Sequence, residues 1–179
     1  MPAARYVPHT AKTLEVILWL ANASQPIDIY HVVKAAFYAD KYHLNKYGRP
    51  ISGDEYQADR YGPLGQCIYG LLIQSPLEML ALETNVPLPF QIGRAWCVVA
   101  EREANARLLS ESDIEALAYG LEQVAGRSFD DLVRATHDEK AYIEANGGLM
   151  RFEDFLDEDD PHHDEKSADL AETARNTVF

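Results

Sequence analysis

The strongest constraint on the fold of this chain is a single carboxylate within an apolar stripe. Residues 29–47 place apolar side chains at helical spacing, and Asp40 occupies the same face. Asp28 is suited to cap this helix at its start, and Gly48 is suited to end it. A carboxylate on a buried face loses its hydration, so it has to be paired, hydrogen-bonded or protonated. The sequence therefore predicts a long helix in the core, with a polar partner for Asp40 inside the protein.

Similar periodicity predicts a helix on each side of this one. Residues 10–24 carry an apolar face, and we expect Thr10 to cap that helix. Later in the chain, Pro63 is expected in the first turn of a third helix, where its missing N–H does no harm. Because proline cannot continue a helix, this third helix is expected to stop before Pro76.

The second half of the chain adds further helices and two short strands. Residues 110–126 and 128–148 each begin with Ser and Asp at capping-box spacing and end at glycine, which predicts a helix in each. Residues 55–61 and 94–101 have the composition of short strands. Irregular structure is expected over 76–93, where prolines interrupt two apolar clusters.

These elements predict a mainly α-helical (α+β) fold. We expect a single compact domain of about five to six helices, with a small antiparallel β element after the second helix. The domain is assigned to residues 1–156. Residues 157–179 are acidic and poor in large apolar side chains, so a mobile tail is expected there.

Composition excludes several classes of protein. The 179 residues include only two cysteines, Cys67 and Cys97, with no metal-ligand spacing, so reduced thiols are expected and no cofactor is indicated. No apolar run is as long as the apolar core of a signal peptide or as a membrane-spanning helix. The sequence therefore predicts a cytoplasmic protein with no membrane partner. The net charge of −13 and the lack of a basic stripe argue against direct nucleic-acid binding. A basic partner protein is expected instead.

Several aspartates and histidines could form a chemical site. Asp40, His43, Asp54, Asp59 and His137 have the side chains that metal binding and acid–base catalysis require. The alternative is structural, in which Asp40 and Asp54 accept hydrogen bonds from the backbone or from tyrosines and fix the reversal after Gly48. No metal-ligand or nucleophile motif is present, so the structural interpretation is favoured and a metal-dependent hydrolase remains an alternative.

Tyrosines are concentrated in one third of the chain. Tyrosine is common on surfaces that are half buried and then covered by a partner. About half of these residues are expected in the core, and the rest are expected on a protein-binding face. The residues are Tyr38, Tyr42, Tyr47, Tyr56, Tyr61 and Tyr69.

Three ordered sequence blocks carry a family resemblance. The first block supplies Tyr38, Asp40 and His43. The second is KYGRPISGD, with Gly48, Arg49, Pro50, Gly53 and Asp54. The third is YQADRYGP, with Tyr56, Ala58, Tyr61, Gly62 and Pro63. Together these blocks resemble the Panacea domain, also described as the SocA-like antitoxin or phage-associated GepA-like domain.

A fourth block resembles the late helix of that family less closely. Thr136 and His137 match, whereas Ala141 and Tyr142 stand where proline and tryptophan are usual. The resemblance covers about residues 10–156.

The resemblance implies a non-enzymatic antitoxin that neutralises a cognate protein toxin by binding it directly. At least one member of the family instead acts as a proteolytic adaptor that presents its toxin to the AAA+ protease ClpXP, so this alternative is retained. No family catalytic residue is implied. The residues expected to contact the partner are Tyr42, Tyr47, Arg49, Tyr56, Arg60, Tyr61 and Tyr142.

Overall fold

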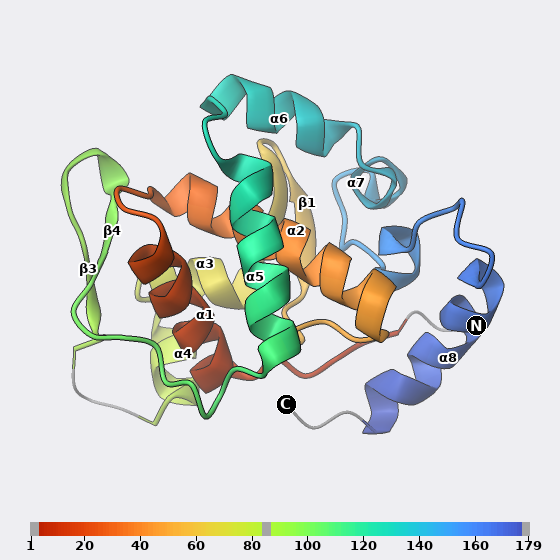
Figure 1. The fold of residues 1–179 in the computed structure, drawn as a ribbon, viewed down its shortest axis with the longest axis horizontal. Coiled ribbons are helices and arrows are strands. Elements are labelled where there is room, and N and C mark those ends of the chain that lie inside the picture. Colours follow the sequence, from red (N-terminus) through yellow and green to blue (C-terminus); the bar gives the residue numbers. More distant parts are fainter. Residues whose placement is uncertain (1–3, 84–86, 177–179) are drawn as a thin grey trace.

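A computed structural model describes residues 4–83 and 87–176 of the chain. Within these residues, eight α-helices and two small antiparallel sheets are built around one core (Figure 1). The predicted mainly helical α+β class is therefore confirmed, including the antiparallel element after the second helix. The helices are α1 (Thr10–Ala23), α2 (Ile29–Tyr47), α3 (Gln66–Leu72), α4 (Pro76–Ala81), α5 (Glu111–Val124), α6 (Phe129–His137), α7 (Lys140–Ala145) and α8 (His163–Asn176). The strands are β1 (Tyr56–Asp59), β2 (Gly62–Gly65), β3 (Phe90–Ile92) and β4 (Val98–Ala100), and short 3-10 helices form η1 (Arg94–Trp96) and η2 (Phe152–Phe155). In Figure 1, β3 and β4 lie at one edge of the core and β1 lies behind α2.

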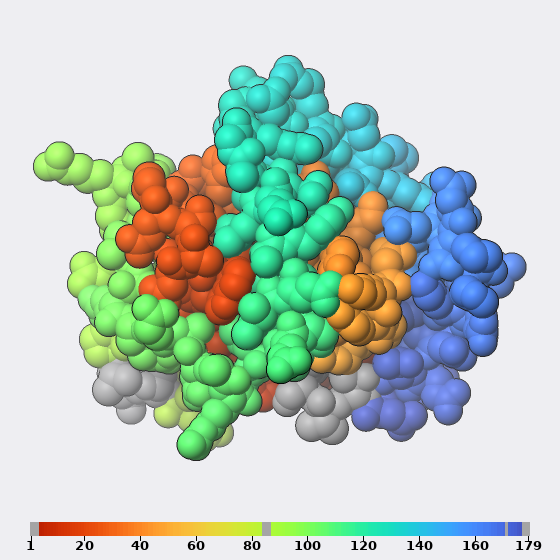
Figure 2. All heavy atoms as spheres, in the orientation of Figure 1, coloured from red at the N-terminus to blue at the C-terminus, as the bar shows by residue number. Residues whose placement is uncertain are grey.

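The centre of the molecule is the packing of α5 across α2, which Figure 1 shows with α5 in front and Figure 2 shows with its side chains in place. Phe37 and Leu44 of α2 are completely buried in this core. Gly120 of α5 lies so close to α2 that a Cβ atom on it would be 2.2 Å from the carbonyl oxygen of Ala35. A larger residue at position 120 would therefore force the two helices apart.

Most of the predicted helix caps are present in the structure. Asp28 accepts a hydrogen bond from the backbone N–H of His31 at 2.9 Å, and Gly48 ends α2 in the left-handed conformation with φ 75°. Both capping boxes are present, at the starts of α5 and α6. The exception is α1, where His9 rather than Thr10 is the cap, because the His9 Nδ1 accepts from the Lys12 N–H at 3.0 Å.

The prediction that Pro63 begins a helix is wrong. Residues 62–65 form β2, which pairs antiparallel with β1 so that Asp59 faces Gly62 and Tyr56 faces Gly65. A two-stranded hairpin has edges that tolerate a proline, and α3 begins only at Gln66. The hairpin is also joined to the late part of the chain, since Ala58 donates its N–H to the carbonyl of Gly148 at 2.9 Å.

Two later segments also differ from their predictions. The region expected to be irregular contains α4 and β3, because Pro76 starts a short helix rather than interrupting one. The helix expected over 128–148 is two helices, α6 and α7. Glu139 between them has an extended backbone, with φ −69° and ψ 131°, which stops the helical path.

The acidic segment, expected to be a mobile tail, is described over residues 157–176, and its mobility stays a prediction. It contains α8, whose Leu170 is buried, and the Lys166 ammonium donates to the carbonyl of Asn45 at 2.7 Å. The tail therefore contacts the end of α2, whereas the assignment of residues 1–156 as the domain stays a prediction. Across 4–83 and 87–176, none of the helices combines the length and apolar character needed to span a membrane.

Candidate functional site

Asp40, in α2, is buried inside the protein, where its side chain contacts the turn that follows this helix. Its side chain is buried, with one oxygen accepting from the Ile51 N–H at 2.7 Å and the other from the Tyr56 hydroxyl at 2.7 Å. Burial raises the pKa of Asp40 to about 6. These are the backbone and tyrosine donors that a structural role for this aspartate requires.

Asp54 makes a second junction, between the reversal and α3. Its oxygens accept from the N–H groups of Cys67 and Ile68 at 2.8 and 2.9 Å, at the start of α3. Burial raises the pKa of Asp54 to about 7, although these two hydrogen bonds favour the charged form. We call Asp40, Asp54 and Tyr56, with the backbone they hold, the motif corner.

His43 does not reach Asp40 as the helical spacing suggested. Its Nδ1 lies 2.7 Å from the carbonyl oxygen of Arg49, and its Nε2 lies 3.0 Å from Ser112 Oγ and 3.3 Å from the carboxylate of Asp113. Burial lowers the pKa of His43, which favours the neutral ring. His43 therefore joins α2 to α5 rather than acting with Asp40.

Asp113 is the centre of a buried ion-pair network on the same side of α2. It pairs with Lys12 at 2.8 Å and with Arg49 at 3.3 Å. Burial alone would raise the pKa of Asp113, but the hydrogen bonds from Lys12 and the Ser110 N–H, together with the charges of Lys12 and Arg49, outweigh it and lower the pKa. Arg49, expected to contact a partner, is thus half buried and already engaged within the chain.

The fourth block attaches α6 and α7 to the hairpin. The His137 ring stacks on Tyr142 at 4.4 Å, and the Tyr142 hydroxyl donates to the carbonyl of Asp59 at 2.9 Å. The Thr136 hydroxyl donates to the carbonyl of Leu132 at 2.7 Å. His137 Nε2 is buried and has no hydrogen-bond partner among the residues that the structure describes. Through Tyr142, the His137 ring lies next to the hairpin and not at the motif corner.

No metal centre is assembled in the part of the chain that the structure describes. Over these residues, no three His, Cys, Asp or Glu side chains are grouped so as to hold a metal ion. Asp40 and Asp54 use both of their oxygens on protein donors. A hydrolase mechanism would need these oxygens for a metal or a water, and here each of them accepts a hydrogen bond from the protein.

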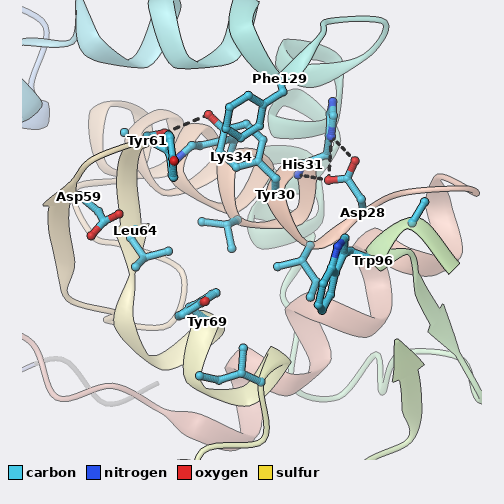
Figure 3. Close-up of a pocket in the computed structure, with 15 residues that line it drawn as sticks. Asp28, Tyr30, His31, Lys34, Asp59, Tyr61, Leu64, Tyr69, Trp96 and Phe129 are labelled. Atoms are coloured by element: carbon cyan, nitrogen blue, oxygen red, sulfur yellow. Dashed lines mark hydrogen bonds and ion pairs between the residues drawn. The ribbon is translucent and has the colours of Figure 1, made fainter. Parts of the chain in front are cut away.

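An open pocket lies beside the motif corner, and we call it the aromatic groove. It has a volume of about 670 Å³ and is formed by the first turns of α2, the β1–β2 hairpin, α3, η1 and the start of α6. Figure 3 shows Tyr61 and Leu64 on the hairpin side, Tyr69 on α3 and Trp96 across the opening. The large apolar and aromatic side chains in its lining include Tyr30, Tyr61, Tyr69, Ile73, Trp96 and Phe129.

These groove side chains are unusually open to solvent for their type. Trp96 is 71% exposed, Ile73 53% and Tyr61 45%. Trp96 and its neighbour Ala95 also have positive φ angles, 60° and 53°, which non-glycine residues rarely adopt. A cluster of exposed aromatic residues around a concave surface is typical of a binding site.

The charged groups of the groove differ in how they are engaged. Lys34 is buried at its base and donates to the carbonyl of Pro63 at 2.6 Å, and burial lowers its pKa to about 7. Asp28 contacts the His31 ring at 2.9 Å, so it has a partner on its own helix. Asp59, at the hairpin end, is exposed, and within the described residues its carboxylate has no hydrogen bond or ion pair.

The tyrosines expected to contact a partner are not on one surface. Tyr61 lines the groove, and Arg60 lies over its ring at 5.2 Å. Tyr42 and Tyr47 instead hydrogen-bond Glu115 on α5, away from the groove lining. Tyr56, also expected to contact a partner, is only 2% exposed in this structure, and its hydroxyl donates to Asp40.

The sequence does not single out several groove residues, among them Lys34, Trp96 and Phe129. Lys34 does carry a signal, since it is a lone cation in the apolar run HVVKAAF of α2. Trp96 was expected within a strand, yet it lies in η1 at the turn before β4. Nothing local marks Phe129, which reaches the groove only because α6 folds back over the hairpin.

Comparison with known proteins identifies one family. The family described as "Antitoxin SocA-like, Panacea domain" matches residues 32–142, which is more than half of the chain and includes the motif corner and the hairpin. No curated protein and no solved structure matches the chain. On this match, the chain belongs to the SocA-like antitoxin family with a Panacea domain.

Proposed function

We propose that this protein is an antitoxin that neutralises a cognate protein toxin in the cytoplasm by binding it directly, without catalysis. The observation that carries the proposal is the aromatic groove on the hairpin that the family blocks build. Trp96, Tyr61 and Phe129 leave large apolar surfaces uncovered there. Side chains of this kind provide most of the energy in protein interfaces when a partner buries them.

The charge of the protein supports a basic toxin as the partner. With a net charge of −13, the chain attracts a cationic surface over long range and repels acidic proteins. The steering is screened by salt, whereas apolar burial is not. Association with the toxin should therefore slow at high ionic strength more than dissociation accelerates.

Co-expression with the adjacent reading frame tests the proposal. We expect the adjacent gene to be toxic alone, growth to be restored when this protein is present, and the two proteins to purify together. A harmless neighbour, or a toxic one that this protein neither rescues nor binds, would contradict the proposal.

The same experiment in cells without ClpXP separates direct neutralisation from the adaptor alternative. Direct binding predicts equal rescue with and without the protease, and an unchanged toxin half-life. If cells without ClpXP are not rescued and the toxin half-life is longer in them, the protein delivers its toxin to ClpXP and direct neutralisation is wrong.

A further inference from the structure

One side of the aromatic groove is a preassembled aromatic wall. The Phe129 ring packs against Tyr30 at 4.4 Å and against Tyr61 at 5.4 Å, so residues from α2, the hairpin and α6 support one another. The Tyr30 hydroxyl also donates to the carbonyl of Tyr61 at 2.9 Å. Rings held in this way lose little conformational freedom when a ligand covers them, which favours binding.

The opposite side of the groove is Trp96, which the protein itself does not cover. The turn that presents it is closed by hydrogen bonds between Gly93 and Cys97 at 2.8 Å and between Cys97 and Arg94 at 3.1 Å. The chain thus holds an exposed indole in a disfavoured backbone conformation across from the aromatic wall. Strained, exposed positions of this kind are concentrated at binding sites.

The charges around the groove decide which ligand chemistry fits. Lys34 is the cation nearest the base, but it already donates to the carbonyl of Pro63, and the Tyr30 ring lies 4.8 Å from its nitrogen. Asp59 is exposed at the hairpin end, with Lys34 and the neighbouring Arg60 as the cations close to it. A ligand that fills the groove therefore meets apolar surface first and an open carboxylate at one edge.

We propose that the groove holds a segment of the toxin in which large apolar side chains are followed by an arginine or lysine that pairs with Asp59. The apolar side chains lie between Trp96 and the aromatic wall. The volume of about 670 Å³ falls within the usual range of ligand pockets, roughly 300–1,000 Å³, which is enough for several side chains but not for a folded domain. This inference rests on the proposed antitoxin function and adds the recognition chemistry of its partner.

Selection from a displayed random-peptide library against the purified full chain tests this recognition. We expect selected peptides to share large apolar residues with an arginine or lysine at a fixed distance. Selection against Asp59→Lys should exchange that cation for aspartate or glutamate, whereas Glu122→Lys, a charge reversal on the exposed face of α5, should not change it. Peptides without a shared cation, or with one that persists against Asp59→Lys, would overturn the assignment.

Binding of the selected peptides locates the site. Trp96→Ala should weaken their affinity roughly tenfold or more, whereas Leu80→Ala, which removes an apolar side chain that is 75% exposed outside the groove lining, should leave it unchanged. Equal loss in both variants, or none in Trp96→Ala, would place the peptides elsewhere. The proposal would also be contradicted if no peptide is enriched in the selection and the groove binds small molecules instead.

The toxin itself distinguishes this inference from the proposed function. If the adjacent gene product is neutralised and Asp59→Lys and Trp96→Ala both leave its affinity unchanged, the antitoxin function stands and the groove assignment is wrong. If the peptide results are as expected but no toxin is neutralised, the groove binds such segments and the antitoxin function is wrong.

Discussion

The motif corner and the aromatic groove are neighbours with opposite organisation. In the corner, polar side chains are buried and Asp40 and Asp54 have protein donors on both oxygens. In the groove, large apolar side chains are exposed, and among the described residues the Asp59 carboxylate has no hydrogen bond or ion pair. The conspicuous sequence blocks mainly build the corner, and the corner in turn positions a surface whose binding side chains come from several other parts of the chain.

The β1–β2 hairpin is the element that the two regions share. Tyr56, at its start, faces the corner and is fixed by Asp40, whereas Tyr61, at its turn, faces the groove. A change in the corner should therefore affect stability first and binding only through loss of folded protein. A change in the groove should affect binding first. Substitutions in the two regions should therefore separate effects on stability from effects on binding.

Asp54→Ala should be the most destabilising of these changes. It leaves two buried N–H groups, those of Cys67 and Ile68, without acceptors, so we expect a loss of about 3 kcal/mol in the free energy of unfolding. Urea unfolding followed by circular dichroism measures this loss. A loss below about 1 kcal/mol would mean that water replaces the carboxylate and that the corner is open.

Asparagine substitutions at the two aspartates provide a matched comparison. Asp40 contacts one backbone N–H and one hydroxyl, and a hydroxyl can accept from the new amide, so Asp40→Asn should cost about 1 kcal/mol. In Asp54→Asn, the NH₂ group of the new amide faces a backbone N–H, which can only donate. This substitution should therefore lower the free energy of unfolding by about 2 kcal/mol. The reverse order would contradict these donor assignments.

Gly62→Ala should disturb the hairpin between the two regions. Gly62 has φ 100°, and a Cβ atom would lie 2.3 Å from the Thr136 hydroxyl oxygen, so we expect a loss of about 2 kcal/mol. Gly48→Ala is the control, because Gly48 also has positive φ, 75°, but a Cβ atom there would have no other atom within 4 Å. Its cost should be about 1 kcal/mol. Equal losses would show that backbone strain alone matters at Gly62.

Lys34 should make stability depend on pH. Because burial lowers its pKa to about 7, the folded protein leaves Lys34 neutral at pH values where the unfolded chain still protonates it. The unfolded state then binds more protons, so stability should rise by about 1.4 kcal/mol per pH unit between about pH 8 and pH 9.5. Lys34→Met should flatten this rise in urea unfolding curves, and an equally steep rise in the variant would assign the dependence to other groups.

Much of the fold is readable from local sequence signals. Periodic apolar faces identify α1, α2 and α5, and caps also mark the starts of α2 and α5, because each signal lies within or next to the helix it defines. The buried position of Asp40 follows in the same way, from its place in the stripe of α2. The misplacement of Pro63 has a physical reason, since proline suits both a first helical turn and the edge of a hairpin.

The groove cannot be predicted from local sequence signals, because its residues come together only through tertiary packing. Phe129 approaches Tyr61 through the return of α6 over the hairpin, and Trp96 approaches through the turn before β4. Tyr56 and Tyr61 have the same composition signal, yet one is buried and the other exposed. Tyrosine content therefore predicts a binding surface somewhere in this region without identifying which rings form it.

Trp96→Ala should have the smallest effect on stability and is the sharpest test of the comparison. Since Trp96 is 71% exposed, its removal should change the free energy of unfolding by less than about 0.5 kcal/mol. Toxin affinity should nevertheless fall roughly tenfold or more, because an interface that buries this ring loses one of its main contacts. Calorimetric titration of the toxin, with thermal unfolding of the same samples, measures both quantities. A variant that loses stability and affinity in parallel would mean that the groove, like the motif corner, is part of the structural frame, and the division between the two regions would fail.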